Sequence, residues 1–220
     1  VPWAGLLAPG SCPKPSADQE LSLNLADDMA NEGKLHASLA NLQNLPSALP
    51  QVRQRQARAY RLLGRPDAEQ LYRSLLGTCL AADGEHGLGQ LASAKGDNGQ
   101  AMAHLQRAAR LAPTDEKIRN DLGVVYLDQR RLEDARFEFM TAIELKQSDQ
   151  LAAVNLVTLL IYQDNWEQAA KVVGQLGLSP DQVTRAQARA QHLKEAGTAP
   201  QRPVKDQVAA VSDTLPASVK

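Results

Sequence analysis

Small and apolar residues recur along this chain at an interval of 34 positions between residues 82 and 149. Leu88, Gly89, Ala101, Leu105 and Ala108 recur in this register as Leu122, Gly123, Ala135, Phe139 and Ala142. The apolar positions of each copy are spaced by whole helical turns, as along one face of an α-helix. The two small positions fit a place where two helices cross closely. The pattern therefore predicts pairs of short helices that pack on each other.

The same pattern extends in both directions and gives five copies, over residues 19–49, 50–81, 82–115, 116–149 and 150–183. A period of 34 with small residues at these places is the signature of the tetratricopeptide repeat, a helix–turn–helix unit that stacks on its neighbours. A further helix is predicted from Pro180 to Ala196, because Ser179 suits its N-cap and proline is tolerated in a first turn. We predict an all-α fold: a tetratricopeptide-repeat solenoid of about five repeats with a C-terminal capping helix.

These elements divide the chain into three parts. Residues 1–18 carry the predicted signal-peptide remnant and lipoprotein tether, and residues 19–197 form the predicted repeat domain. The tail, residues 198–220, contains three prolines and shows little periodicity. Such a composition is typical of a disordered segment, and we predict disorder there.

Composition narrows the range of functions. The chain has a formal net charge of −1, and near-neutrality argues against a nucleic-acid partner. The four histidines lack the spacing of a zinc-protease helix, and no glycine loop carries the lysine of a phosphate site. We therefore expect no catalytic residues, no metal, no cofactor and no small-molecule substrate. A stack of such repeats that lacks an active site is typical of proteins that bind other proteins.

The concave side of the stack is the predicted binding site for a protein partner. Its side chains come from the first helices of the fourth and fifth repeats: Asn120, Val124, Leu127, Asp128, Leu151, Val154, Thr158, Ile161 and Tyr162. These nine residues are called the predicted groove below. Many of them are apolar, and an exposed apolar strip usually marks a binding site for a partner helix or an extended peptide. The alternative is that the terminal helix or the tail covers the strip. The strip can be both covered and a binding site if a partner displaces that cover.

The first cysteine is the predicted lipidation site. Residues 1–11 carry no charge, and Gly10 and Ser11 are small residues directly ahead of Cys12. This resembles the end of a bacterial lipoprotein signal peptide, in which the cysteine becomes the lipidated first residue of the mature protein. The alternatives are a free thiol or a disulfide with Cys79, which the pattern places as a small buried side chain at the end of a helix.

A run within the fourth repeat resembles one protein family. Leu122–Arg136, followed by Phe137–Leu145, is similar to the central repeats of TadD, the assembly lipoproteins of the tight-adherence (Tad, or Flp) pilus. The resemblance extends over about residues 12–196.

The resemblance implies a pilotin, a protein that binds a segment of the secretin pore subunit and helps it reach and assemble in the outer membrane. It implies a lipid on Cys12 and a place on the periplasmic face of that membrane, and Pro13 after the cysteine agrees with outer-membrane sorting. The alternative function is a soluble repeat scaffold or co-chaperone with a cytoplasmic location and another protein partner.

Overall fold

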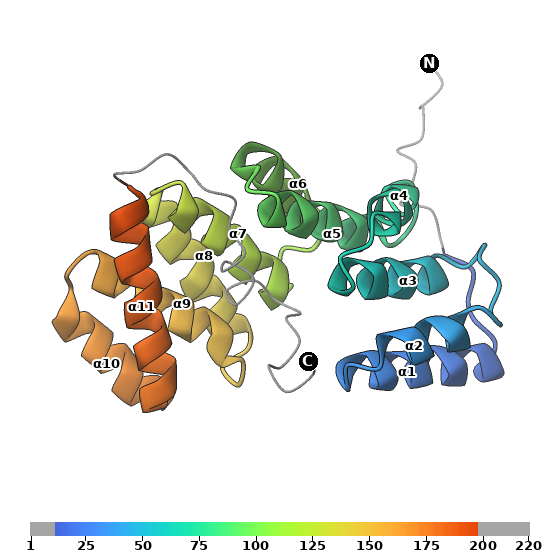
Figure 1. Cartoon of the computed structure of the whole chain (residues 1–220), viewed down its shortest axis with the longest axis horizontal. Helices are drawn as coiled ribbons and strands as arrows, with labels where there is room; N and C mark the ends of the chain where they lie inside the picture. Colours follow the sequence, from blue (N-terminus) through green and yellow to red (C-terminus); the bar gives the residue numbers. More distant parts are fainter. Residues whose placement is uncertain (1–11, 198–220) are drawn as a thin grey trace, which may run out of the picture. The chain divides into compact units, whose positions relative to one another are not determined.

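The computed structural model describes residues 12–197, and every regular element in that range is an α-helix (Figure 1). The helices are α1 (Ala17–Asn31), α2 (Leu35–Leu42), α3 (Pro50–Leu62), α4 (Asp67–Ser74), α5 (Ala81–Ala94), α6 (Asn98–Leu111), α7 (Glu116–Asp128), α8 (Leu132–Leu145), α9 (Gln150–Tyr162), α10 (Trp166–Leu176) and α11 (Pro180–Ala196). The predicted all-α fold is confirmed, with two helices in each repeat and α11 as the terminal helix. The predicted tail, 198–220, lies outside the described residues.

The turn inside each repeat contains one residue with a positive φ. In the first three repeats that residue is glycine, at positions Gly33, Gly64 and Gly96. In the last two it is Arg130, with φ 60°, and Asp164, with φ 57°. A left-handed backbone disfavours residues with a side chain by roughly 1–2 kcal/mol, so these two turns hold a conformation that glycine would adopt more easily.

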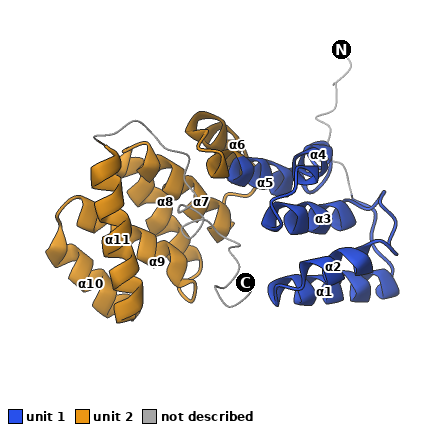
Figure 2. Cartoon of the chain, in the orientation of Figure 1, with its two compact units in different colours: residues 1–91, 213–220 blue, residues 92–212 orange. Residues whose placement is uncertain are grey.

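The chain divides into two compact units (Figure 2). Among the described residues, unit 1 comprises 12–91 and unit 2 comprises 92–197, so the division falls within α5. No helix in the described range 12–197 has the length and apolar composition needed to cross a membrane.

The buried apolar side chains of unit 1 form three separate clusters. One surrounds Leu42 and Val52, a second surrounds Tyr72 and Leu75, and a small third one includes Leu35. Each cluster draws on three consecutive helices, so the apolar packing of unit 1 is divided rather than continuous.

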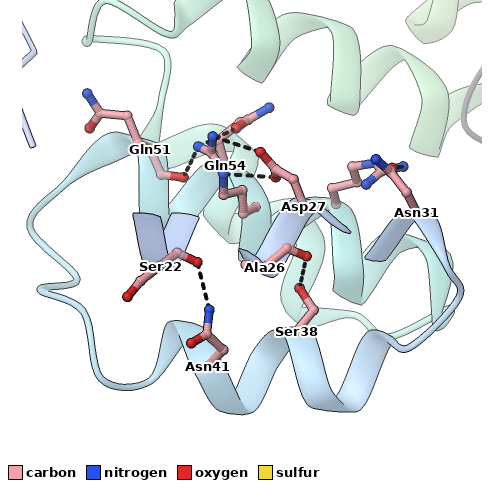
Figure 3. Close-up of polar contacts among 10 residues, drawn as sticks. Ser22, Ala26, Asp27, Asn31, Ser38, Asn41, Gln51 and Gln54 are labelled. Carbon is pink, nitrogen blue, oxygen red and sulfur yellow. Dashed lines mark hydrogen bonds and ion pairs between the residues drawn. The ribbon is translucent and has the colours of Figure 1, made fainter. Parts of the chain in front are cut away.

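Polar contacts add to this packing between the first three helices (Figure 3). Ser38 on α2 occupies one of the small repeat positions, and its hydroxyl donates to the Ala26 carbonyl of α1 at 2.8 Å. Arg55 on α3 binds both carboxylate oxygens of Asp27, at 2.9 and 3.0 Å. A serine therefore fits at the close helix crossing because its buried hydroxyl has an acceptor.

A disulfide links Cys12, ahead of α1, to Cys79, between α4 and α5, across 67 positions of the sequence. The bond therefore encloses both helix pairs of the first two repeats in one covalent loop. The expectation that Cys79 is buried is wrong, since its side chain is exposed. The reason is that α4 ends at Ser74, so Cys79 lies in a segment of turns rather than on a helix face.

Unit 2 has one continuous core that runs from α6 to α11. Phe139 of α8 belongs to it and is the largest fully buried side chain among the described residues. A Cβ atom added at Gly123 on α7 would lie 2.6 Å from the Phe139 ring, so the small repeat position is required by this close approach. The core also takes in Ala186, Ala190 and Leu193 of α11, which ties the terminal helix to the repeats.

Candidate functional site

The side chains of the predicted groove come from α7 and α9, as the repeat pattern requires, but most of them are covered. Asn120, Val124, Leu127, Asp128, Thr158 and Ile161 are buried, and Leu151, Val154 and Tyr162 are half-buried. The expectation of an exposed apolar strip is therefore wrong for this structure.

Helix α11 accounts for part of this burial, and the packing of α7 on α9 accounts for another part, as at Asn120. Helix α11 lies against α9 (Figure 1), and its residues Ala186, Ala190 and Leu193 join the same core as Leu127 and Ile161. Whereas α9 packs extensively on α8, α11 makes little contact with α10. It therefore does not take the place of the first helix of a sixth repeat. Of the two alternatives drawn from the sequence, the structure has the terminal helix over the strip.

One ion pair joins α11 to the end of α7. The Arg189 Nη2 group donates to Asp128 Oδ1 at 3.0 Å, and the Asp128 side chain is 3% exposed. Burial raises the pKa of the Asp128 carboxyl above its ordinary range, and the attraction of Arg189, Arg130 and His192 offsets this only in part. Burial likewise lowers the pKa of the Arg189 guanidinium, against the attraction of Asp128. Both shifts indicate that desolvation of these charges outweighs their mutual attraction.

The two non-glycine turn residues also hold α11. Arg130 donates through Nη2 to the Leu193 carbonyl at 2.6 Å, and its guanidinium lies 5.5 Å from the centre of the Tyr162 ring. Lys194 donates to Asp164 Oδ1 at 2.6 Å. A cation at the last turn of a helix complements the helix dipole, and here the Leu193 carbonyl accepts from Arg130 in addition to the Gly197 N–H. The two side chains in left-handed turns thus contact the last turns of α11.

The polar end of this contact is incompletely paired. Asp128 Oδ2, Arg130 Nε and Arg189 Nε are buried and have no hydrogen-bond partner among residues 12–197. Leaving a buried polar group unpaired costs about 1–3 kcal/mol, more when the group is charged. The fit of α11 at this end is therefore poorer than the apolar part of its contact.

Asn120 has a different environment from the rest of the predicted groove. Its side-chain oxygen accepts a hydrogen bond from Asn155 of α9 at 2.7 Å, and its amide donates to Asp121 at 3.1 Å. All three residues are buried. This network joins α7 to α9 inside unit 2, so Asn120 positions the two helices on which the groove is built.

A hollow of about 430 Å³ runs beside α11. Ile161 and Trp166 form its apolar wall, and Trp166 is 53% exposed. Across from this wall, α11 presents polar side chains, among them Thr184 and Gln187. The helix therefore leaves the apolar side chain of Trp166, at the start of α10, only partly covered.

Sequence reasoning missed four residues of this site: Arg130, Asp164, Arg189 and Lys194. The turns carried a usable signal, because the left-handed position is glycine in three repeats and charged in the last two. The two α11 residues carried no comparable signal, since both lie on a mostly polar helix outside the repeat pattern.

Cys12, the predicted lipidation site, is joined to Cys79 in the structure. A lipid on this cysteine and the disulfide require the same sulfur atom, so one molecule carries one modification or the other. The disulfide is one of the alternatives that the sequence left open, and the lipid stays a prediction.

Known proteins similar to this chain agree with the repeat architecture. Residues 92–153 match the model of the family described as tetratricopeptide repeat. The chain is 43% identical over 189 residues to the TPR repeat-containing protein PA4299 of Pseudomonas aeruginosa, covering 86% of this chain and 77% of that protein.

Two solved structures share the fold at 20% identity. TTC0263, a thermophilic TPR protein of Thermus thermophilus, superposes with a TM-score of 0.58 over 78% of this chain and 98% of its own. YrrB, described as a TPR protein with an unusual peptide-binding site, gives 0.50 over 79% of this chain and 90% of its own.

Proposed function

The chain belongs to the tetratricopeptide-repeat proteins, and from this we propose that it is a protein-binding adaptor whose partner is the secretin subunit of a Tad (Flp) pilus. Proteins of this family generally act as interaction modules without catalysis. The observation that carries the binding role is α11, because this helix of the chain itself lies against α9 and the end of α7, the two helices that carry the predicted groove. The peptide-binding site named for YrrB lends further support.

The finer part of the proposal is the role of a pilotin on the periplasmic face of the outer membrane. It is supported by the similarity of Leu122–Arg136 and Phe137–Leu145 to the repeats of the TadD family. Both modifications of Cys12 support a location outside the cytoplasm, because structural disulfides persist mainly in oxidising compartments such as the periplasm. In this role the lipid on Cys12 anchors the protein, and the groove holds a secretin segment.

A second candidate, a soluble repeat scaffold without a lipid, is favoured by the disulfide, because the bonded sulfur is not available for acylation. Two cysteine variants separate the candidates. With the native upstream sequence and in the native bacterium, a lipoprotein stays in the outer membrane as Cys79→Ser and becomes soluble as Cys12→Ser. A soluble scaffold gives the same soluble fraction for both variants and for the wild type.

Intact mass measured on the same samples completes the test. A mass that starts at Cys12 and includes acyl chains supports the pilotin, and co-purification of the secretin subunit with the wild-type protein identifies the partner. An unacylated, soluble product that captures no secretin contradicts the pilotin role and leaves the scaffold.

A further inference from the structure

We propose that α11 is a resident ligand, and that the predicted groove is the receptor for a partner helix of similar design that takes its place. This inference rests on the proposed role as a protein-binding adaptor and names the chemistry of the partner segment. The partner is an amphipathic helix with two small residues four positions apart, an arginine directly before the second, and a leucine three positions after it. In α11 these places are Ala186, Arg189, Ala190 and Leu193.

The apolar half of the argument is the packing of α11 itself. Ala186 and Ala190 are buried, with 1% and 0% of their surface exposed, so the helix backbone approaches α9 closely at these two places. Leu193 is the one larger side chain of α11 that is fully part of the core. A competing helix must keep the small residues, because bulky side chains there would push it away from the groove.

The charged half is complementarity at the end of α7. Asp128 requires a cation from the incoming helix, and Arg130 and Asp164 require a helix carbonyl and a second cation near its C-terminal end. These three contacts fix the direction in which a helix lies in the groove.

Two features make α11 a replaceable occupant. First, three buried polar atoms at this contact have no hydrogen-bond partner among residues 12–197. They are Arg189 Nε on α11 and, opposite it, Asp128 Oδ2 and Arg130 Nε. Second, Gln187 of α11 faces the hollow walled by Ile161 and Trp166. A partner helix with an apolar side chain at the place of Gln187 gains contact that α11 lacks, and it gains affinity for the groove.

The test uses the full chain and a fluorescein-labelled peptide of residues 179–197, with binding followed by fluorescence anisotropy. Arg189→Glu sets two acidic groups against each other and loosens α11 in its own groove. We expect this variant to bind the peptide at least about tenfold more tightly than the wild type does. The control is Arg185→Glu, an exposed position on the same helix, which should bind the peptide as weakly as the wild type.

Two modified probes test the recognition chemistry. An Asp128→Arg chain should prefer the peptide that carries R189E over the native peptide by about tenfold. A peptide that carries Q187L should bind the Arg189→Glu chain more tightly than the native peptide does. Equal binding to the wild type and to Arg189→Glu overturns the proposal, and so does no binding by a variant that keeps its helicity.

Should Arg189→Glu lose the helicity of α7 to α10, Lys194→Glu takes its place, with a gain in peptide affinity of about threefold expected and equal binding as the contrary outcome, because Lys194 contacts the exposed Asp164. The assay contains no secretin. Failure here therefore leaves the pilotin proposal standing, and failure to capture secretin leaves the receptor for a helix standing.

Discussion

Unit 1 and unit 2 use the same repeat but are stabilised in different ways. In unit 1 the apolar core is divided into three clusters, and a disulfide encloses residues 12–79. In unit 2 one core runs from α6 to α11, and a terminal helix with charged contacts covers it. A cross-link acts mainly by restricting the unfolded chain, whereas a continuous core acts through packing in the folded one. The comparison shows that the same repeat pattern can be stabilised either by a cross-link over small clusters or by one continuous core.

The largest effect should come from removing the largest fully buried side chain of the unit 2 core. Phe139→Ala deletes a fully buried ring, and we expect it to lower the free energy of unfolding of unit 2 by about 3–5 kcal/mol. Because the core is continuous, hydrogen exchange should speed up through α11 as well. Phe137→Ala, on the same helix but 65% exposed, is the control and should change stability little. Loss of protection confined to α8 would contradict a single core.

Removing the disulfide should affect unit 1 alone. Cys79→Ser opens a loop of 67 positions, and the chain-entropy estimate gives a loss of about 4 kcal/mol. Hydrogen exchange should rise across α1 to α4 and stay unchanged in α7 to α11. The double variant Cys12→Ser, Cys79→Ser should no longer respond to a reductant. A reductant effect on that variant would show that the reductant acts on something other than this disulfide. Faster exchange in α11 would contradict an effect confined to unit 1.

The ion pair that holds α11 should matter to unit 2 by a smaller amount. Arg189→Met leaves the buried carboxylate of Asp128 without its main cation and should destabilise unit 2 by about 3 kcal/mol. Adding Asp128→Asn removes that charge and should restore most of the loss, as measured by denaturant unfolding. Equal losses in the single and the double variant would mean that Arg189 acts through packing rather than charge.

The same variant should respond to pH in a defined direction. The pKa of Asp128 is raised in the folded protein by burial, so folding favours its protonated form. Its contribution to the free energy of unfolding is therefore fully present below the unfolded pKa and declines as pH rises through the folded pKa. Arg189→Met raises that pKa further, so its deficit relative to the wild type should shrink from neutral pH toward about pH 4. A deficit that grows on acidification would rule out this assignment.

The smallest effects should come from exchanging the turn residues of the two units. Asp164→Gly relieves a left-handed aspartate and loses an exposed ion pair, so stability should change by less than about 1 kcal/mol. Amide exchange in the last turn of α11 should nevertheless become faster. The reverse change in unit 1, Gly64→Asp, places a side chain in a left-handed turn without a terminal helix to contact. It should lower the free energy of unfolding by about 1 kcal/mol. Unchanged exchange in α11 would show that Asp164 does not hold the helix.

The sequence was sufficient to predict the helices and the two that carry the groove. The reason is physical, since small residues such as Gly123 and Ala135 and buried ones such as Phe139 are required wherever two helices cross at this spacing. Whether the terminal helix covers the groove could not be predicted in the same way. Residues 180–196 form an amphipathic helix wherever they lie, and only the contacts of Arg189 and Leu193 show which surface they occupy.

The pairing of the cysteines was likewise only one possibility among several. It depends on α4 ending at Ser74, which leaves Cys79 in an exposed turn segment where Cys12 can reach it. The binding role of the groove residues remains a prediction, because the packing of α11 on α9 shows what lies at the groove in this structure and not what else enters it.

The disulfide also has a mechanical consequence. A pulling force applied to the chain ahead of Cys12 passes through the sulfur–sulfur bond to Cys79, and so it bypasses all the residues between them. The four helices α1 to α4 lie within the closed loop, so they carry no tension and are not extended by the force. Under reducing conditions the same force would unfold α1 first. The redox state of this one bond therefore decides whether the first two repeats bear any force.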